Sequence, residues 1–159
     1  MRHKVFMVMA LLLGAPVSAS EPLVGIASVI DGDSLEIHGQ RVRLLGIDAP
    51  ESRQTCMKDG NPWRCGKDAA FALSDKIGRQ PISCETKGKP DRYGRAIAVC
   101  RLGDEDLNAW MVRGGWAMAY RQYSKAYVED EATAREARRG IWAAEFMPPW
   151  EWRKQGRKK

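Results

Sequence analysis

Three acidic residues stand where predicted strands end. Asp33 lies in the run D-G-D-S, and Asp48 and Glu51 lie in the run G-I-D-A-P-E. Carboxylates at neighbouring strand ends can converge on one cavity, and hard divalent cations such as calcium prefer carboxylate and carbonyl oxygens. Each run alone is also a common turn or helix lead-in. It is their combination that favours an open, oxygen-lined metal site completed by water.

Two arginines approach the same region. Arg43 ends a predicted strand just before Asp48, and Arg95 opens another after the run D-R-Y-G. A guanidinium offers a planar fork of donors that suits phosphate oxygens. Taken singly, each arginine is as readily a solvent-exposed surface residue.

Histidine chemistry is limited by the composition. His38 is the one histidine beyond the N-terminal segment, because the other is His3. A mechanism that needs two histidines is therefore impossible, and a Ser-His-Asp triad would have to use His38. Nothing near His38 resembles a nucleophile turn, and we interpret it as a residue on a strand surface.

The elements that position these residues follow from the apolar spacing. Residues 23–30, 34–38 and 41–45 predict a three-stranded meander that turns at Gly39-Gln40. Residues 82–86 and 95–101 predict an antiparallel hairpin around a connection rich in turn-forming residues. Helices are predicted at residues 67–77, 106–113 and 126–139, each followed by glycine. Strands first and helices between and after them indicate a single α+β domain.

Four cysteines follow the N-terminal segment: Cys56, Cys65, Cys84 and Cys100. An even number in an exported chain indicates disulfides. Zinc is the alternative, but the chain contains no C-x-x-C pair. Three pairings are possible in principle. The predicted hairpin places Cys84 opposite Cys100, which leaves Cys56 to pair with Cys65 across a predicted loop.

The N-terminus predicts export. Arg2 and Lys4 precede an uncharged stretch at residues 5–17, and V-S-A supplies small residues for cleavage. We expect residues 1–19 to be a signal peptide and the mature chain to begin near Ser20. An uncleaved anchor is the alternative, but the stretch is shorter than the roughly 18–20 residues that span a bilayer. No second long apolar run follows, so no membrane span is expected after leader removal.

The positive charge is concentrated at the C-terminus. The chain carries +6, and without the leader its 24 basic and 20 acidic residues leave +4. Five basic residues lie within the last seven, so the body of the chain is nearly neutral. We divide the mature chain into a domain at residues 20–146 and a basic tail at 147–159. The tail either holds a polyanion or is a solvated end, and we favour the solvated end.

The ordered motifs resemble the thermonuclease, or staphylococcal nuclease-like, family. The matching runs are V-I-D-G-D-S-L, V-R-L-L-G-I-D-A-P-E, D-R-Y-G-R and R-G-I-W, and they extend over residues 23–142. The resemblance implies an OB-fold, a five-stranded antiparallel β-barrel with three helices. Ala49 and Ser34 stand where the family often has threonine. The cysteines also distinguish this chain from the cysteine-free staphylococcal form.

The resemblance also implies roles for the residues of the site. Asp33, Asp48 and the Ala49 carbonyl would hold Ca²⁺, and Glu51 would activate or position the attacking water. Arg43 and Arg95 would bind the phosphate as negative charge develops on it. Phosphodiester hydrolysis needs an aligned water, a proton acceptor and preorganised positive charge more than a strong nucleophile, so these roles are chemically coherent.

Aromatic residues complete the expected substrate site. Arg92, Tyr93, Tyr120 and Tyr123 are the candidates for binding nucleotides by stacking or by contact with phosphate. Tyr120 matches the family's nucleotide-binding tyrosine best. Trp110, Trp116 and Trp142 are expected in the core, whereas Trp150 and Trp152 lie beyond the resemblance and carry no assignment.

The function that follows is a calcium-dependent, extracytoplasmic endonuclease. It would cleave DNA and RNA to 3′-phosphorylated products as a periplasmic or secreted monomer without an obligate protein partner. Two alternatives remain: a noncatalytic OB-fold binding module, and an envelope protein whose disulfides and basic tail serve a protein or polysaccharide partner. Retention of the full charged set favours the enzyme.

Overall fold

The computed structural model describes residues 21–156 of the chain. The predicted signal peptide and the last three residues of the predicted tail lie outside the described residues. Within the described part, no helix is both long and apolar enough to cross a membrane.

A five-stranded barrel forms the centre of the fold. Its strands are β1 (Leu23–Asp31), β2 (Ser34–Ile37), β3 (Gln40–Leu44), β7 (Pro81–Thr86) and β8 (Ala96–Leu102). Neighbouring strands run antiparallel in the order β3-β2-β1-β7-β8, with the short β9 (Glu105–Asp106) beside β8. The barrel closes through a parallel pairing of β3 with β8. The expected barrel is confirmed, but not its purely antiparallel pairing: an odd number of alternating strands must close on one parallel pair.

The barrel interior follows the alternation of the strands. Leu35, Ile37, Val42 and Leu44 are almost completely buried and contribute to the main hydrophobic core. The β2–β3 turn lies at His38-Gly39, one residue earlier than predicted, and both residues have positive φ angles, 50° and 79°. Such two-residue turns match the twist of paired strands, which explains why His38 leaves the strand.

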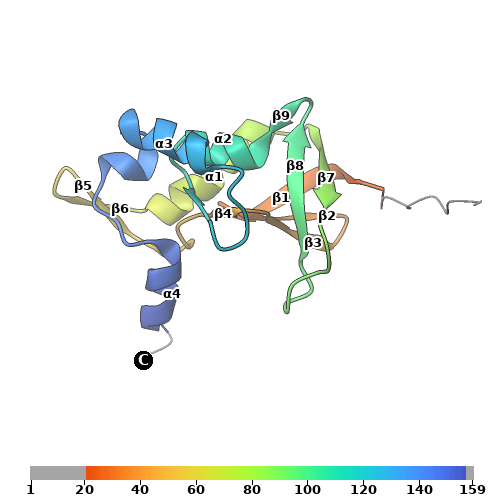
Figure 1. The fold of residues 1–159 in the computed structure, drawn as a ribbon, viewed down its shortest axis with the longest axis horizontal. Helices are drawn as coiled ribbons and strands as arrows, with labels where there is room; N and C mark the ends of the chain where they lie inside the picture. The colour runs from red at the N-terminus through yellow and green to blue at the C-terminus, as the bar shows by residue number, and fades with distance from the viewer. Residues whose placement is uncertain (1–20, 157–159) are drawn as a thin grey trace, which may run out of the picture.

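Helices gather along one flank of the barrel (Figure 1). They are α1 (Cys65–Ile77), α2 (Leu107–Arg113) and α3 (Val128–Glu136), followed by the 3₁₀ helix η1 (Gly140–Ala143). The three predicted helices are confirmed. However, α3 is shorter than expected at both ends, and Arg138 adopts a φ of 51° that a continuing helix does not allow.

A disulfide-bridged hairpin replaces the predicted loop after Glu51. It consists of β5 (Cys56–Lys58) and β6 (Asn61–Trp63), and the Cys56–Cys65 bond joins it to the start of α1. The second bond, Cys84–Cys100, crosses directly opposed residues of β7 and β8. Both expected pairings are therefore present in the structure.

The C-terminal segment is ordered where a solvated tail was favoured. Residues Pro149–Gly156 form a fourth helix, α4, that leads away from the hairpin (Figure 1). The chain before α4 is held by paired backbone hydrogen bonds of 2.8 Å between Met57 and Glu145. Within α4, Pro149 is buried and Arg153 is partly buried, so the prediction of a solvated end is wrong for these two residues, whereas Lys154 and Gln155 are exposed.

Candidate active site

Two buried aspartates meet on one arginine. Asp33 directly precedes β2, Asp48 lies in β4 (Ile47–Asp48), and their side chains are 5% and 0% exposed. From β3, Arg43 donates to Asp33 Oδ1 at 2.7 Å and to Asp48 Oδ1 at 3.0 Å. The guanidinium therefore bridges the two carboxylates and compensates their buried charge.

The second oxygen of Asp33 fixes the following loop. Asp33 Oδ2 accepts a hydrogen bond of 2.9 Å from the backbone N–H of Ala49, and Oδ1 also accepts one from Ser34. Ala49, whose carbonyl is one expected metal ligand, is thus bonded through its N–H to Asp33, which is another expected ligand. Since this contact uses the backbone, alanine suffices at position 49.

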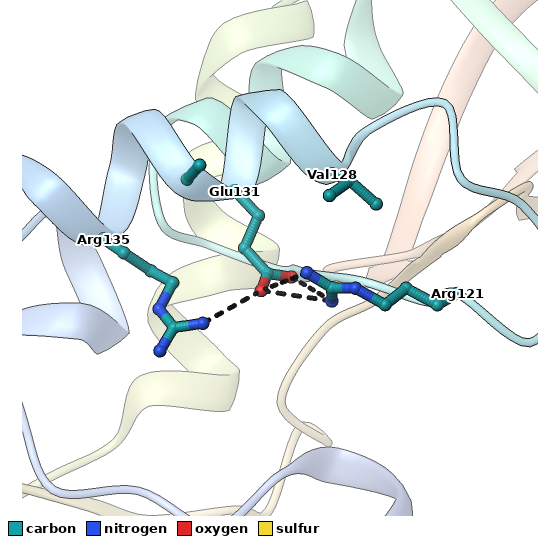
Figure 2. Close-up of a pocket in the computed structure, with 5 residues that line it drawn as sticks. Arg121, Val128, Glu131 and Arg135 are labelled. Atoms are coloured by element: carbon teal, nitrogen blue, oxygen red, sulfur yellow. Dashed lines mark hydrogen bonds and ion pairs between the residues drawn. The ribbon is translucent and has the colours of Figure 1, made fainter.

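Asp48 is held in place by a short strand pair. β4 pairs antiparallel with β10 (Met118–Ala119), and the Ala119 N–H donates at 2.7 Å to Glu131 of α3. Glu131 is 1% exposed and lies between Arg121 and Arg135, where these residues line a shallow pocket (Figure 2). We therefore interpret the ion pairs of this pocket as structural. They hold Glu131, which binds β10, the strand that pairs with β4 and so positions Asp48.

Burial raises the pKa values of two aspartates in this region, Asp48 and Asp31. Burial raises the pKa of Asp48, as does the nearby charge of Asp33, while hydrogen bonding from Arg153 opposes this. Asp31 caps the same turn by accepting from the Asp33 N–H. Burial, together with the charge of Asp33, raises the pKa of Asp31 to about 7. The sequence reasoning assigned Asp31 no role.

Glu51 lies in a loop built around the buried Gln54. The Gln54 side chain accepts from the Glu51 N–H at 3.2 Å and donates to the Met147 carbonyl at 2.7 Å. Its own N–H donates to the Glu51 carbonyl at 2.7 Å. Gly66 packs so closely that an added Cβ would lie 1.7 Å from that carbonyl oxygen. The position of Glu51 thus depends on both α1 and the chain leading to α4.

Arg153 of α4 is the site residue that sequence reasoning missed. Its guanidinium donates to Asp48 at 2.9 Å and 2.8 Å, using both carboxylate oxygens, and to Glu51 Oε1 at 2.7 Å. Burial lowers the pKa of Arg153, but hydrogen bonds and charge from the two acids raise it more, giving a net increase. No local pattern in the sequence connects Arg153 with these acids, because they lie 105 and 102 residues away along the chain.

Arg95 lies on the approach to the same turn. Its guanidinium bonds Asp91 at 2.8 Å and Ser34 Oγ at 3.3 Å, and it is 23% exposed. Burial raises the pKa of Asp91, but hydrogen bonds from Arg95 and Tyr93 lower it below its ordinary value. Ser34 links this arginine to Asp33, so the structure brings the expected catalytic residues into one hydrogen-bonded group.

The expected substrate-binding residues form two separate pairs, one of arginine with tyrosine and one of two tyrosines. Arg92 lies over the exposed Tyr93 ring and bonds its hydroxyl. Tyr120 and Tyr123 meet edge to face at 4.9 Å, and Tyr123 is exposed. The Tyr120 ring also stacks on Trp150, with centroids 5.5 Å apart and planes within 2°. This contact belongs to α4 and was not expected.

The donor set suits a hard cation without forming a complete metal cage. Across residues 21–156, no group of three or more carboxylate, imidazole or thiol side chains is arranged to hold a metal ion. Oxygen atoms line the site, and the guanidinium of Arg153 already stands as a cation against Asp48 and Glu51. Two aspartates would therefore need backbone oxygen and water to complete a calcium shell.

Comparisons with known proteins agree with this geometry. The model of the family described as staphylococcal nuclease homologue matches residues 41–144. A succinoglycan biosynthesis protein, ExoI, of Rhizobium meliloti is 41% identical, over 86% of this chain and 73% of its own length. A micrococcal nuclease of Shigella flexneri is 34% identical, over 81% and 79%. A thermonuclease of Staphylococcus hyicus is 29% identical, over 79% of each chain.

The matched region contains Arg43, Asp48, Glu51 and Arg95. Arg43 bonds both Asp33 and Asp48, Ser34 connects Arg95 to Asp33, and Arg153 bonds both Asp48 and Glu51. The chain therefore belongs to the staphylococcal nuclease homologue family.

Proposed function

We propose that this protein is a calcium-dependent, extracytoplasmic endonuclease that hydrolyses DNA and RNA to 3′-phosphorylated products. The observation that carries the proposal is the convergence on one charged group of two buried aspartates, Glu51 and the arginines. Membership of a nuclease family supports the reaction class. A pure binding module has no need to keep the complete set.

The residues divide the chemistry between them. Glu51, 30% exposed and fixed at its backbone by Gln54, positions or deprotonates a water. The guanidinium of Arg95 is held in place by Asp91 and is still partly exposed, which suits contact with a phosphate oxygen. Arg43 fixes both aspartates and adds positive charge beneath the phosphate.

Asp33, Asp48 and the Ala49 carbonyl would hold the calcium ion. When bound, the ion would supply further positive charge to neutralise the phosphate. The burial of both aspartates supports this assignment, because a cation relieves the cost of two carboxylates placed together.

The aromatic residues would bind the nucleotides. Exposed Tyr93 and Tyr123 offer faces for stacking, and Arg92 adds a positive charge beside Tyr93. Stacking on aromatic rings does not distinguish deoxyribose from ribose, which agrees with activity on both nucleic acids.

Export is supported by the two disulfides, because such bonds persist in oxidising compartments. A periplasmic or secreted protein that acts as a monomer fits this proposal. Sequencing the N-terminus of the protein recovered from the periplasm and from the medium tests it. A start near Ser20 is expected, whereas an intact Met1 would contradict export by signal cleavage.

The nuclease proposal is tested with the oxidised mature protein on single-stranded DNA and RNA. Reactions contain Ca²⁺ or a chelator, and fragment ends are identified by mass spectrometry. Glu51→Gln should lower the cleavage rate by about 10²-fold or more, whereas Glu136→Gln on the exposed face of α3 should leave it unchanged. Equal cleavage by both variants would refute the role of Glu51.

One observation favours the noncatalytic binding module as a second candidate. Arg153 occupies both oxygens of Asp48, as expected of a chain that uses these carboxylates for structure. Nucleic-acid binding without cleavage, with and without Ca²⁺, would establish that alternative.

A further inference from the structure

The helix α4 places two side chains on the residues that the proposed reaction requires. Trp150 and Arg153 lie three positions apart and therefore share a helix face. Trp150 stacks on Tyr120, the expected nucleotide-binding tyrosine, and Arg153 binds Asp48 and Glu51. One short helix thus contacts the residues expected to bind the nucleotide, the metal ion and the attacking water: Tyr120, Asp48 and Glu51.

The contacts of Arg153 use the atoms that a cation would need. Both oxygens of Asp48 accept from its guanidinium, and Oε1 of Glu51 accepts from the same nitrogen that bonds Asp48 Oδ1. Asp48 Oδ1 additionally accepts from Arg43. A divalent cation at Asp48 would therefore lie against the Arg153 guanidinium, where two positive charges repel each other strongly because the site is partly buried.

The anchorage of α4 allows it to leave without unfolding the domain. The chain before it is fixed by the Met57–Glu145 pairing and by the Gln54 bond to Met147. Beyond that point, Pro149 is the buried residue of the helix, while Trp150 and Arg153 are partly exposed. Helices held by a few contacts open locally at low cost.

We propose that α4 is an internal competitor of the active site: docked α4 and a bound divalent cation exclude one another at Asp48 and Glu51. In the cation-free protein, Arg153 compensates the buried Asp48 and Trp150 covers Tyr120. Cation binding displaces Arg153, releases α4 and exposes the Tyr120 ring to substrate. The inference rests on the proposed calcium site and adds its regulation.

Because α4 docking and cation binding exclude one another, docking must change the measured affinity for calcium. If the docked state is closed to cations, docking lowers the apparent cation affinity by the fraction of molecules with α4 undocked. Weakening the docked state must therefore tighten calcium binding. Calorimetric titration of CaCl₂ into the oxidised mature protein measures this independently of cleavage.

Three substitutions distinguish competition by docked α4 from a nonspecific effect of positive charge on calcium affinity. Arg153→Met should tighten calcium binding by about tenfold or more. Trp150→Ala should tighten it in the same direction, although it changes no charge. Lys154→Met removes one positive charge from the same helix at a side chain that bonds Glu151 instead, and it should leave the affinity within about twofold. Circular dichroism confirms that each variant is folded.

Hydrogen exchange of the α4 amides provides the second readout. Calcium should accelerate exchange across residues 150–156 in the wild-type protein while it slows exchange around Asp48. Equal affinities in all four proteins, with α4 protected in calcium, would overturn the competition and leave the proposed nuclease intact. Absence of calcium binding in every protein would overturn the calcium site, and this inference with it.

Discussion

At the residue scale, the site depends on arginines that are shared between acids. Arg43 serves Asp33 and Asp48 together, and Asp48 also accepts from Arg153. Burying a carboxylate costs several kcal/mol unless it is paired and hydrogen-bonded. The geometry resolves this by giving every oxygen of the two aspartates a donor. These hydrogen bonds fix the orientation of both carboxylates in the structure.

Asp91 carries the pH prediction at this scale. Its pKa is lowered, so the stabilisation it contributes is present above its unfolded pKa and is lost as the pH falls through the folded value. Asp91→Asn keeps an oxygen for the Tyr93 and Arg95 amides but loses the ion pair with the Arg95 side chain. We expect it to lower the free energy of unfolding by about 1 kcal/mol at pH 7 and by less at pH 3.

Urea titrations at the two pH values measure this difference. The same variant should raise KM for an oligonucleotide more than it changes kcat, because Arg95 would lose the partner that orients it. An unfolding free energy that differs from wild type equally at both pH values would exclude the ion pair as the cause.

At the element scale, the hairpin after Glu51 connects the site to the C-terminus. Cys56 and Cys65 belong to a second small core with Met118 and Ile141, and Trp63, Trp142, Phe146 and Trp150 pack against it. The cluster contacts both segments: Cys65 Sγ lies 3.6 Å from the Gln54 carbonyl oxygen in the Glu51 loop, and Trp150 of α4 packs against it. Because the hairpin is short and this core is small, the Cys56–Cys65 bond supplements the limited apolar area that is buried here.

Gly66 gives the element-scale prediction. A methyl group at this position would meet the Glu51 carbonyl oxygen at 1.7 Å, so the loop or the first turn of α1 must move. Gly66→Ala should lower the cleavage rate by about tenfold or more and destabilise the protein by about 1–3 kcal/mol. Ser74→Ala, on the exposed part of the same helix, is the control. Unchanged kinetics in Gly66→Ala would show that Glu51 tolerates displacement.

At the scale of the whole molecule, the two disulfides stabilise different parts of the fold. Cys84–Cys100 closes a separation of 16 residues inside the barrel, whereas Cys56–Cys65 closes 9 residues beside the site. The first stabilises the barrel by restricting the unfolded chain. The second also supports the loop that carries Glu51.

Removing each bond separates these tasks. Cys84→Ala with Cys100→Ala should lower the free energy of unfolding by about 3 kcal/mol and leave the cleavage rate at low temperature unchanged. Cys56→Ala with Cys65→Ala should reduce the cleavage rate as well. Denaturant titrations and initial rates on the oxidised proteins provide the measurements. A loss of activity from the first pair alone would contradict this division.

The sequence by itself determined the features that depend on local pattern. Alternation predicted the barrel strands, glycine stops predicted the ends of α1 and α2, and the hairpin symmetry placed Cys84 opposite Cys100. These features involve residues close in sequence, whose geometry is limited by backbone sterics and side-chain period. The predicted end of α3 before Gly140 was wrong, because this helix ends at Glu136.

Only the tertiary structure decided the features that depend on long-range contact. The parallel β3–β8 closure follows from the number of strands that join the barrel. Arg153 reaches Asp48 and Glu51 across 105 and 102 residues, a distance at which no local period carries information. The sequence therefore showed the positive charge of Arg153, but its contact with the candidate site depends on the packing of α4, where Trp150 stacks on Tyr120.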